Sequence, residues 1–149
     1  MSYTPRHFDP WEVFPHIGEK TTWESLDPFI RARISDEILE TGDAVRDLVG
    51  LPCRANDYHR GGHRQFCGVR TEASAYYSPT SRHAVTKWRP AGALDLHFKD
   101  MAADDVRTLI RKAVANGALP HLGGLELDVS WVHIDDRPRK FGKLVEFTR

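Results

Sequence analysis

Two segments, well separated along the chain, most constrain how it can fold. Residues 81–97 contain His83 and Asp95, and residues 130–135 contain His133. Two imidazoles and one carboxylate are a common ligand set for catalytic Zn²⁺, which takes three protein ligands and leaves its fourth position to water. The sequence therefore predicts a metal site, and the fold must bring the two segments together to form it.

Other histidines compete for the same role, because the chain contains eight of them. His97 follows Asp95 by two residues, so on a strand both side chains would point to the same side. It is therefore an alternative ligand, or a group that orients one. His59 and His63 flank two glycines, which disfavour the helix that would bring these histidines together. We expect both in a loop.

Composition excludes several classes of protein. The 149 residues suit one domain, residues 1–149, with enough chain to bury a core. The 21 basic and 21 acidic residues cancel, so no net field attracts nucleic acid or an anionic membrane. The sequence has no long apolar run of the kind that spans a bilayer, and it does not begin with a secretory signal. We expect a monomer made in the cytoplasm, without nucleic-acid or membrane partners.

Hydrophobic periodicity predicts an α+β fold, with a small, mainly antiparallel sheet and packed helices. One helix is expected over residues 27–49, with Gly42 as a point where it could break, and another from an Asp100 N-cap to Asn116. Residues 1–23, rich in aromatic residues and proline, are expected to wrap the domain without regular structure. Short apolar runs predict strands at residues 51–55, 93–98, 125–127, 131–134 and 144–147.

The two cysteines, Cys53 and Cys67, do not form a Cys-x-x-Cys motif. Isolated cysteines of this kind are most often buried free thiols. A disulfide is the second interpretation and zinc ligation the third.

The segments that carry the metal ligands resemble the signature of the D-alanyl-D-alanine carboxypeptidase and L-alanyl-D-glutamate endopeptidase family. These zinc peptidases share their fold with the hedgehog signalling domain. The family pattern is Ser-x-His-x-x-Gly-x-Ala-x-Asp, followed by a histidine on a later strand. Residues 81–83 match its first part, residues 91–95 its second and residues 131–135 the closing strand. Relative to the pattern, residues 86–90 are an insertion, and Ala91 stands where the family usually has glycine.

The resemblance extends roughly over residues 30–136 and implies a function. It implies a hedgehog/DD-peptidase-like fold that holds one Zn²⁺ through His83, Asp95 and His133. The implied reaction is hydrolysis of a peptide bond in the stem or cross-link peptides of bacterial peptidoglycan by a metal-activated water. Relatives without a signal peptide are carried by phages or released at lysis, so we expect a phage-encoded enzyme of the endolysin type.

The general base is not at its usual place. The family's enzymes carry a carboxylate three residues before the last histidine ligand, where this chain has Ser130. The nearest carboxylates are Glu126 and Asp128, and resemblance to the hedgehog-type members makes Glu126 the first choice. In an unbroken strand Glu126 and His133 would face opposite sides, so this assignment requires a turn at residues 128–130.

The resemblance also implies an arginine that holds the carbonyl or carboxylate of the substrate. Residues 56–62 resemble the family's turn, which makes Arg60 the aligned candidate, and Arg70 is the alternative. A guanidinium beside a zinc site can stabilise the oxyanion of a tetrahedral intermediate. Ser81, the first residue of the signature, is assigned to substrate binding. The inserted residues 86–90 are expected to form an exposed loop.

Two other functions compete with a peptidase. One is a non-catalytic hedgehog-like module, for example of a phage particle, in which the metal only braces the fold. In such a module a fourth protein ligand, such as His97, would occupy the remaining coordination position of the metal. The other is nucleic-acid binding, which the balanced charge disfavours. It would use the arginines of the central region, Arg60, Arg64, Arg70, Arg82 and Arg89.

Overall fold

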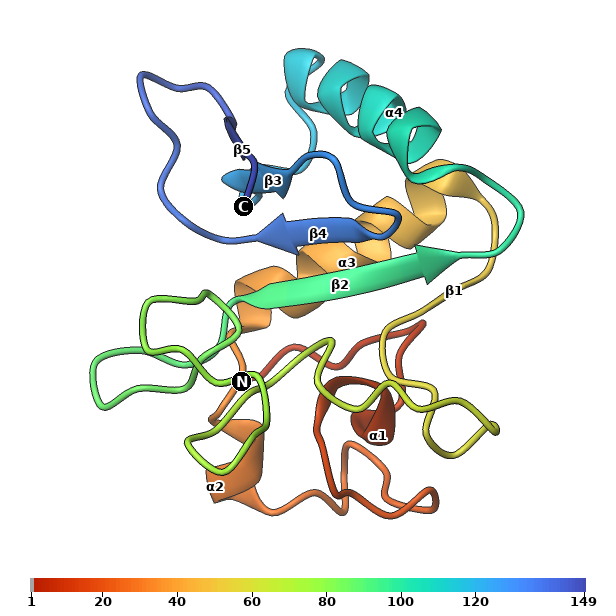
Figure 1. Ribbon diagram of the computed structural model, residues 1–149, viewed down its shortest axis with the longest axis vertical. Coiled ribbons are helices and arrows are strands. Elements are labelled where there is room, and N and C mark those ends of the chain that lie inside the picture. The colour runs from red at the N-terminus through yellow and green to blue at the C-terminus, as the bar shows by residue number, and fades with distance from the viewer. Residues whose placement is uncertain (1) are drawn as a thin grey trace.

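The computed structural model describes residues 2–149, which form four α-helices and a five-stranded sheet (Figure 1). The fold is therefore α+β, as predicted. The helices are α1 (Pro10–Val13), α2 (Pro28–Arg31), α3 (Asp36–Val49) and α4 (Ala103–Ala115). The strands are β1 (Cys53–Arg54), β2 (Ala93–Phe98), β3 (Gly124–Glu126), β4 (Val132–Asp135) and β5 (Val145–Phe147).

The strand order in the sheet is β1-β2-β4-β3-β5. The pairings of β1 with β2, β2 with β4 and β3 with β4 are antiparallel, whereas β3 and β5 are parallel. The sheet is thus mixed, with the predicted antiparallel arrangement in its centre. In the centre of the sheet Asp95 of β2 lies directly opposite His133 of β4. This register brings two of the predicted metal ligands together.

Helices α3 and α4 pack on one face of the sheet, where Figure 1 shows α3 behind β2 and β4. Since side chains alternate between the faces of a strand, Leu94 and Leu96 enter this apolar layer, and Asp95 and His97 belong to the other face. Burial of each large apolar side chain contributes about 1.5–3 kcal/mol. The layer is built from fully buried residues of four elements, Ile38, Leu39, Val45, Leu94, Leu96, Val106, Ile110, Val132 and Ile134.

The prediction of one helix over residues 27–49 is wrong, because the chain forms two helices there. The break lies before Ser35, which caps the N-terminus of α3, and not at Gly42. At Gly42 a Cβ atom would lie 2.9 Å from Leu94 Cδ1 and 3.2 Å from Phe8 Cε2. Any larger residue at position 42 would press on Leu94 and Phe8, because the sheet and the N-terminal segment approach α3 closely there.

Helix α4 begins later than predicted. Its N-cap is Ala102 rather than Asp100, and no side chain caps it. Asp104 and Asp105 lie in the first turn, where carboxylates interact favourably with the helix dipole. None of the described helices is long and apolar enough to cross a membrane.

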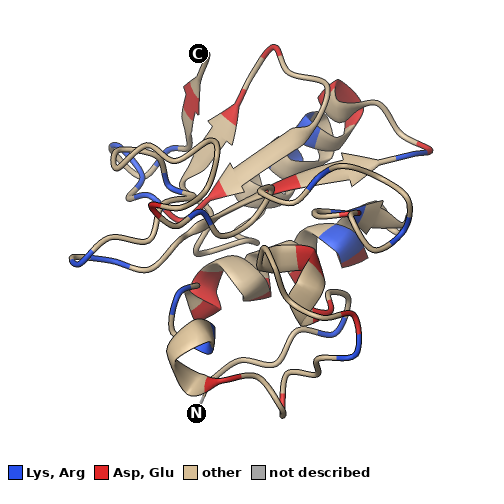
Figure 2. Ribbon diagram, turned by 60° about the horizontal axis from the view of Figure 1, so that its bottom comes forward, with Lys and Arg blue, Asp and Glu red and all other residues tan. Residues whose placement is uncertain are grey.

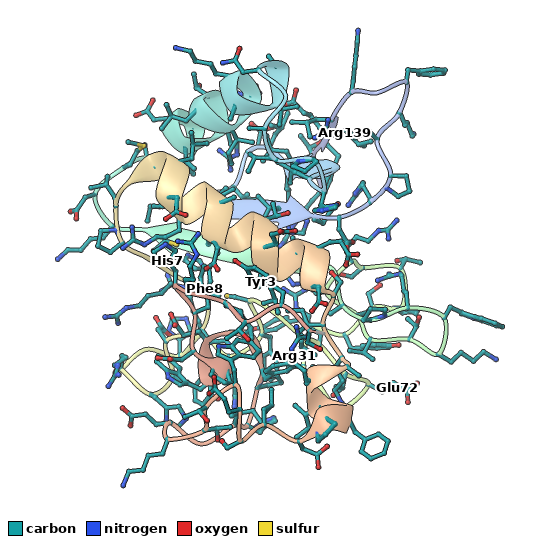
Figure 3. The ribbon with its side chains drawn as sticks, turned by 180° about the vertical axis from the view of Figure 1, so that it is seen from behind. Tyr3, His7, Phe8, Arg31, Glu72 and Arg139 are labelled. Carbon is teal, nitrogen blue, oxygen red and sulfur yellow. The ribbon has the colours of Figure 1, made fainter. Side chains whose placement is uncertain are left out.

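The N-terminal segment runs along α3, and its only helix among the described residues is the single turn of α1. Tyr3 Oη donates to Asp43 Oδ2 at 2.6 Å, and the backbone N–H groups of Arg6 and His7 donate to the same carboxylate at 2.7 and 3.0 Å. Figure 3 shows Tyr3, His7 and Phe8 beside α3. Asp43 is fully buried, and it anchors the segment to the helix.

Residues 86–90 form an exposed loop, as predicted. Trp88 is 83% exposed, and Lys87 Nζ lies 4.7 Å from the centre of its ring. The loop leaves the sheet intact, because β2 begins only at Ala93. The loop lies between His83 and Asp95 in the sequence, and His83 Nε2 still lies 3.2 Å from Asp95 Oδ1.

Candidate metal centre

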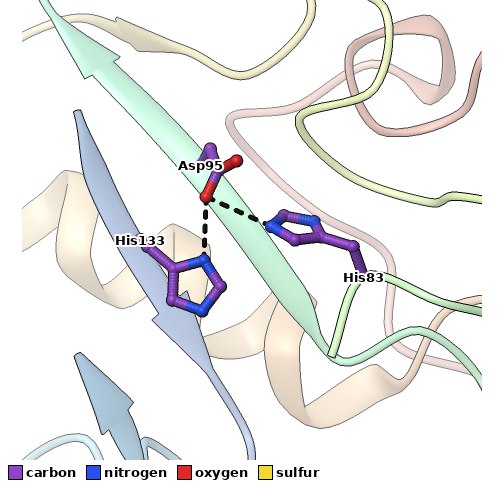
Figure 4. Close-up of side chains that lie close together, drawn as sticks. All are labelled: His83, Asp95 and His133. Atoms are coloured by element: carbon purple, nitrogen blue, oxygen red, sulfur yellow. Dashed lines mark hydrogen bonds and ion pairs between the residues drawn. The ribbon is translucent and has the colours of Figure 1, made fainter. Parts of the chain in front are cut away.

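His83, Asp95 and His133 meet on the face of the sheet opposite the helices. His83 Nε2 lies 3.2 Å and His133 Nδ1 lies 2.9 Å from the same oxygen, Asp95 Oδ1 (Figure 4). All three side chains are buried, and their candidate ligand atoms lie within 4.8 Å of one another. Ligand atoms of a tetrahedral Zn²⁺ site lie about 3.3 Å apart, given the usual bond lengths. The residues present therefore fit a metal ion.

The fold holds these ligands from two directions. The β2–β4 register sets Asp95 opposite His133 on the sheet. His83 comes from a loop outside the sheet, and its carbonyl accepts a hydrogen bond from Arg70 N at 2.8 Å. The segment before Arg70 is in turn attached to β2, because Asp95 N donates to the Cys67 carbonyl at 2.7 Å. These backbone bonds bring His83 over the strand that carries Asp95.

Each histidine uses its other ring nitrogen for a fixed hydrogen bond. His83 Nδ1 lies 2.8 Å from the carbonyl oxygen of Gly68, and His133 Nε2 lies 2.8 Å from Asp135 Oδ2. Both acceptors require a protonated nitrogen, so these bonds select the tautomers. His83 Nε2 and His133 Nδ1 are then the nitrogens that can offer a lone pair to a metal, and both face Asp95.

Asp135 contacts the candidate ligand His133, and the sequence interpretation assigned it no role. Its carboxylate is buried, and Arg137 donates to it through Nε at 2.7 Å and Nη2 at 2.6 Å. Gly124 lies directly opposite on β3, where a Cβ atom would come within 2.1 Å of Asp135 Oδ1. The sequence contained the information needed to predict this contact. Asp135 follows His133 by two residues on a predicted strand, so both side chains point to the same face.

Burial and charge interactions define the protonation of the metal-free centre. Burial opposes the charge on Asp95 and Asp135. The pKa of the Asp95 carboxyl is nevertheless held well below its usual range by His83 and His133, and that of Asp135 by His133 and Arg137. Burial also opposes protonation of His133, yet hydrogen bonds to Asp135 and Asp95 raise its pKa to about 9. The pKa of His83 is lowered, chiefly by burial. A metal cation would therefore displace one proton, from His133.

Glu126 lies beside His133. Continuing the β3–β4 register by one residue sets the two opposite each other, and Glu126 Oε2 lies 4.0 Å from His133 Nδ1. Glu126 is buried, and its Oε1 accepts from Arg149 Nε at 2.8 Å. The turn that this placement requires is present, with Asp128 at a positive φ of 59°. Asp128 itself is exposed and does not line the cleft above the centre.

A cleft of about 970 Å³ opens over the centre, and its walls include Glu126, Ser81 and His97. Ser81 Oγ accepts a hydrogen bond from the backbone N–H of His83 at 3.2 Å. His97 is not part of the ligand cluster, because its Nε2 contacts Cys67 Sγ at 3.5 Å. The three candidate ligands therefore face the cleft, and His97 does not join them as a fourth ligand.

Of the two arginines predicted to bind substrate, only Arg70 lies at the centre. Its Nη2 lies 3.4 Å from Asp95 Oδ2, and the residue lines the cleft. Arg60 does not line the cleft, because an ion pair of 2.6 Å with Glu19 holds it against the N-terminal segment. The structure thus corrects the assignment of Arg60 and leaves Arg70 as the arginine next to the ligands.

The cysteines are free thiols, as predicted. Burial raises the pKa of Cys53 and of Cys67 to about 12, so both thiols are neutral at ordinary pH. A neutral thiol is a poor nucleophile and a poor metal ligand. Neither cysteine therefore contributes a charged group to the centre.

Comparison with known proteins found no matching family model, no similar curated protein and no similar solved structure. The class of site is consequently described by its geometry. It is a buried His–Asp–His cluster that can hold a metal ion, at the base of a cleft that also contains a buried carboxylate and an arginine.

Proposed function

We propose that this chain is a zinc-dependent peptidase that hydrolyses a peptide bond in the stem or cross-link peptides of bacterial peptidoglycan. The observation that carries the proposal is the His83–Asp95–His133 cluster beneath an open cleft, with Glu126 beside it. Three ligands and a free position favour a catalytic over a structural metal. The substrate class, the phage origin and a hedgehog/DD-peptidase-like fold are supported by the resemblance of residues 81–95 and 131–135 to that family's signature.

The protein's part in this chemistry begins with the ligands. Zn²⁺ in this site would polarise the scissile carbonyl and bring the pKa of a water molecule to near neutrality. His83 and His133 would hold the ion through Nε2 and Nδ1, and Asp95 would hold it through Oδ1. Gly68 and Asp135 keep the two imidazole rings in the orientation that binding requires.

Glu126 is the proposed general base. Its Oε2 lies 4.0 Å from His133 Nδ1, and the residue lines the cleft above the candidate ligands. Arg149 binds the other oxygen, Oε1, and so directs Oε2 to the centre. Glu126 takes a proton from the water at Oε2 and returns it to the amine that leaves when the peptide bond breaks.

Arg70 is the proposed electrophilic group. Its Nη2 makes a long contact of 3.4 Å with Asp95 Oδ2. Its guanidinium lies in the wall of the cleft, so it can donate to the carbonyl oxygen of the substrate as negative charge develops there. Donors that are already in place stabilise such an oxyanion without reorganising during the reaction.

A second candidate function is a non-catalytic metal-binding module, for example of a phage particle. The ion pair between Arg149 and Glu126 favours it, because it occupies one oxygen of the only carboxylate that lines the cleft besides Asp95 among the described residues. In such a module the metal would stabilise the fold, and Glu126 would serve only to bind Arg149.

One experiment separates the two functions. Purified protein is loaded with one equivalent of zinc and incubated with purified peptidoglycan fragments, and the products are identified by mass spectrometry. The peptidase proposal expects peptide products, their loss on chelation and their recovery when zinc is restored. Stoichiometric zinc without any hydrolysis would establish the metal-binding module instead. The His83→Ala variant serves as the control without a complete site.

A further inference from the structure

Two exposed loops begin next to residues that line the cleft. The first, residues 86–90, follows the wall that contains Arg82, and the second, residues 137–143, begins at the wall residue Arg137. Figure 1 shows both loops projecting from the same side of the molecule. A large partner that enters the cleft from this side would therefore meet both loops.

The second loop presents an aromatic ring at a position where the backbone disfavours one. Phe141 is 100% exposed, with φ of 52°, and Gly142 follows with φ of 73°. Backbone bonds of 3.1 and 2.9 Å between Lys140 and Lys143 close this tight turn. Turns with two positive φ values favour Asn-Gly, so folding alone would select asparagine at position 141. A strained, fully exposed aromatic residue indicates use of the ring at the surface.

The first loop presents a second ring in a fixed position. Trp88 is 83% exposed, and Lys87 Nζ lies over its ring. Thr86 Oγ1 accepts from the backbone N–H groups of Trp88 and Arg89, both at 3.2 Å. Arg89 Nη2 donates to the Ser81 carbonyl at 2.7 Å, which ties the loop to the wall of the cleft. The ring is thus held outward by an ordered loop.

Both loops are basic, although the chain as a whole is neutral. Neither residues 86–90 nor residues 137–143 include an acidic residue, and Figure 2 shows Lys and Arg on both loops. Lys87, Lys140 and Lys143 are exposed and form no ion pair with any residue in the described range 2–149. Their ammonium groups are therefore available to an anionic partner.

We propose that these two loops form a docking surface for peptidoglycan strands. Trp88 and Phe141 would stack on the apolar faces of the sugar rings, and the three lysines would bind the carboxylates of the attached peptides. Rigid aromatic residues provide large contact areas at a small cost in conformational entropy. The choice of this partner rests on the proposed function. Peptidoglycan carries the peptides that the cleft would hydrolyse, so its strands would also reach both loops.

The test is co-sedimentation with insoluble, purified peptidoglycan. The wild-type chain is compared with the Trp88→Ser/Phe141→Asn double variant, whose asparagine suits the turn and should preserve the fold. The double variant is expected to bind at least about tenfold more weakly, as for other exposed aromatic anchors. Its hydrolysis of small soluble fragments should match that of the wild type. Phe29→Ser is the matched control, because Phe29 is 85% exposed but lies on α2, outside the two loops.

The outcomes separate docking from catalysis. Equal sedimentation of the wild type and the double variant overturns the docking surface. Sedimentation of the wild type with anionic phospholipid vesicles but not with peptidoglycan also overturns it and assigns the loops to a lipid surface. Loop-dependent binding to peptidoglycan supports the docking surface even if the wild type hydrolyses no fragment, in which case only the proposed peptidase function fails.

Discussion

His133 and Asp135, two residues apart on β4, are joined by a contact of 2.8 Å between Nε2 and Oδ2. The contact turns His133 Nδ1 towards Asp95, 2.9 Å away. Because side chains two residues apart share one face of a strand, a short piece of sequence supplies both the ligand and the group that orients it. Asp135 should therefore influence metal binding without touching the metal.

Asp135→Asn is expected to weaken zinc binding by roughly 10- to 100-fold, as for other carboxylates that orient a histidine ligand. The affinity is measured by competition with a chromogenic chelator. Asp136→Asn is the matched control, since the Asp136 carboxylate accepts from Ser35 Oγ at 2.7 Å and not from His133. Equal losses in the two variants would contradict a specific role for Asp135.

His83→Ala and His133→Ala are each expected to abolish stoichiometric zinc binding, because two remaining ligands hold the ion too weakly. Metal content after mild chelation is the measurement. His63→Ala should keep its zinc, because His63 lines the cleft but does not belong to the ligand cluster. If both alanine variants retained one equivalent, the ligand assignment would be wrong.

Glu126→Gln is expected to retain zinc and to lose hydrolysis by about 10²- to 10⁴-fold, the usual contribution of a general base. Turnover of soluble peptidoglycan fragments at saturating zinc is the measurement. Asp128→Asn should behave as the wild type, because Asp128 is exposed and outside the cleft lining. A large loss in Asp128→Asn, with Glu126→Gln active, would reverse the assignment.

The metal-free protein is expected to lose stability as the pH rises from 6.5 through about 9. Folding raises the pKa of His133 from 6.5 to about 9, so its contribution is fully present below the lower value and lost above the higher one. Asp95 and Asp135 have depressed pKa values, so their contributions are lost only in acid. Since each pKa unit is worth about 1.4 kcal/mol, the loss is on the order of 3 kcal/mol.

Denaturant unfolding at about pH 6 and about pH 10, with and without zinc, measures this change in the free energy of unfolding. The zinc-loaded protein should show little of it, because metal binding removes the proton from His133 at both values. A metal-free protein that is equally stable at both values would show that His133 is not protonated in the folded state.

Arg107→Ala is expected to destabilise the fold by on the order of 3 kcal/mol, because it leaves buried carbonyl groups without a donor. Arg107 is 1% exposed and donates to the carbonyls of Glu126, Val129 and Trp131 at 3.0, 2.6 and 2.8 Å. Arg111→Ala on the same helix removes an exposed ion pair and should cost less than about 1 kcal/mol. Denaturant unfolding compares the two, and a similar small cost for both would contradict the role of Arg107 in holding the β3–β4 turn.

Local patterns in the sequence were sufficient for much of the fold. The short apolar runs at residues 93–98, 125–127 and 131–134 predicted β2, β3 and β4 within a residue or two. Helical spacing identified α3 and α4, but it did not locate the break before Ser35 or the start at Ala103. Both boundaries depend on caps and on packing against other segments, which periodicity does not report.

The sequence by itself determined which side chains were available for a metal site, because the ligand types and their spacing are local properties. Only the tertiary structure decided which distant groups meet them. It placed Arg70 rather than Arg60 beside Asp95, and Glu126 rather than Asp128 beside His133. These choices depend on strand register, on the turn between β3 and β4, and on the ion pair that holds Arg60 away. The β2–β4 register and the ion pair between Arg60 and Glu19 join residues far apart in the chain, so no local pattern encodes them.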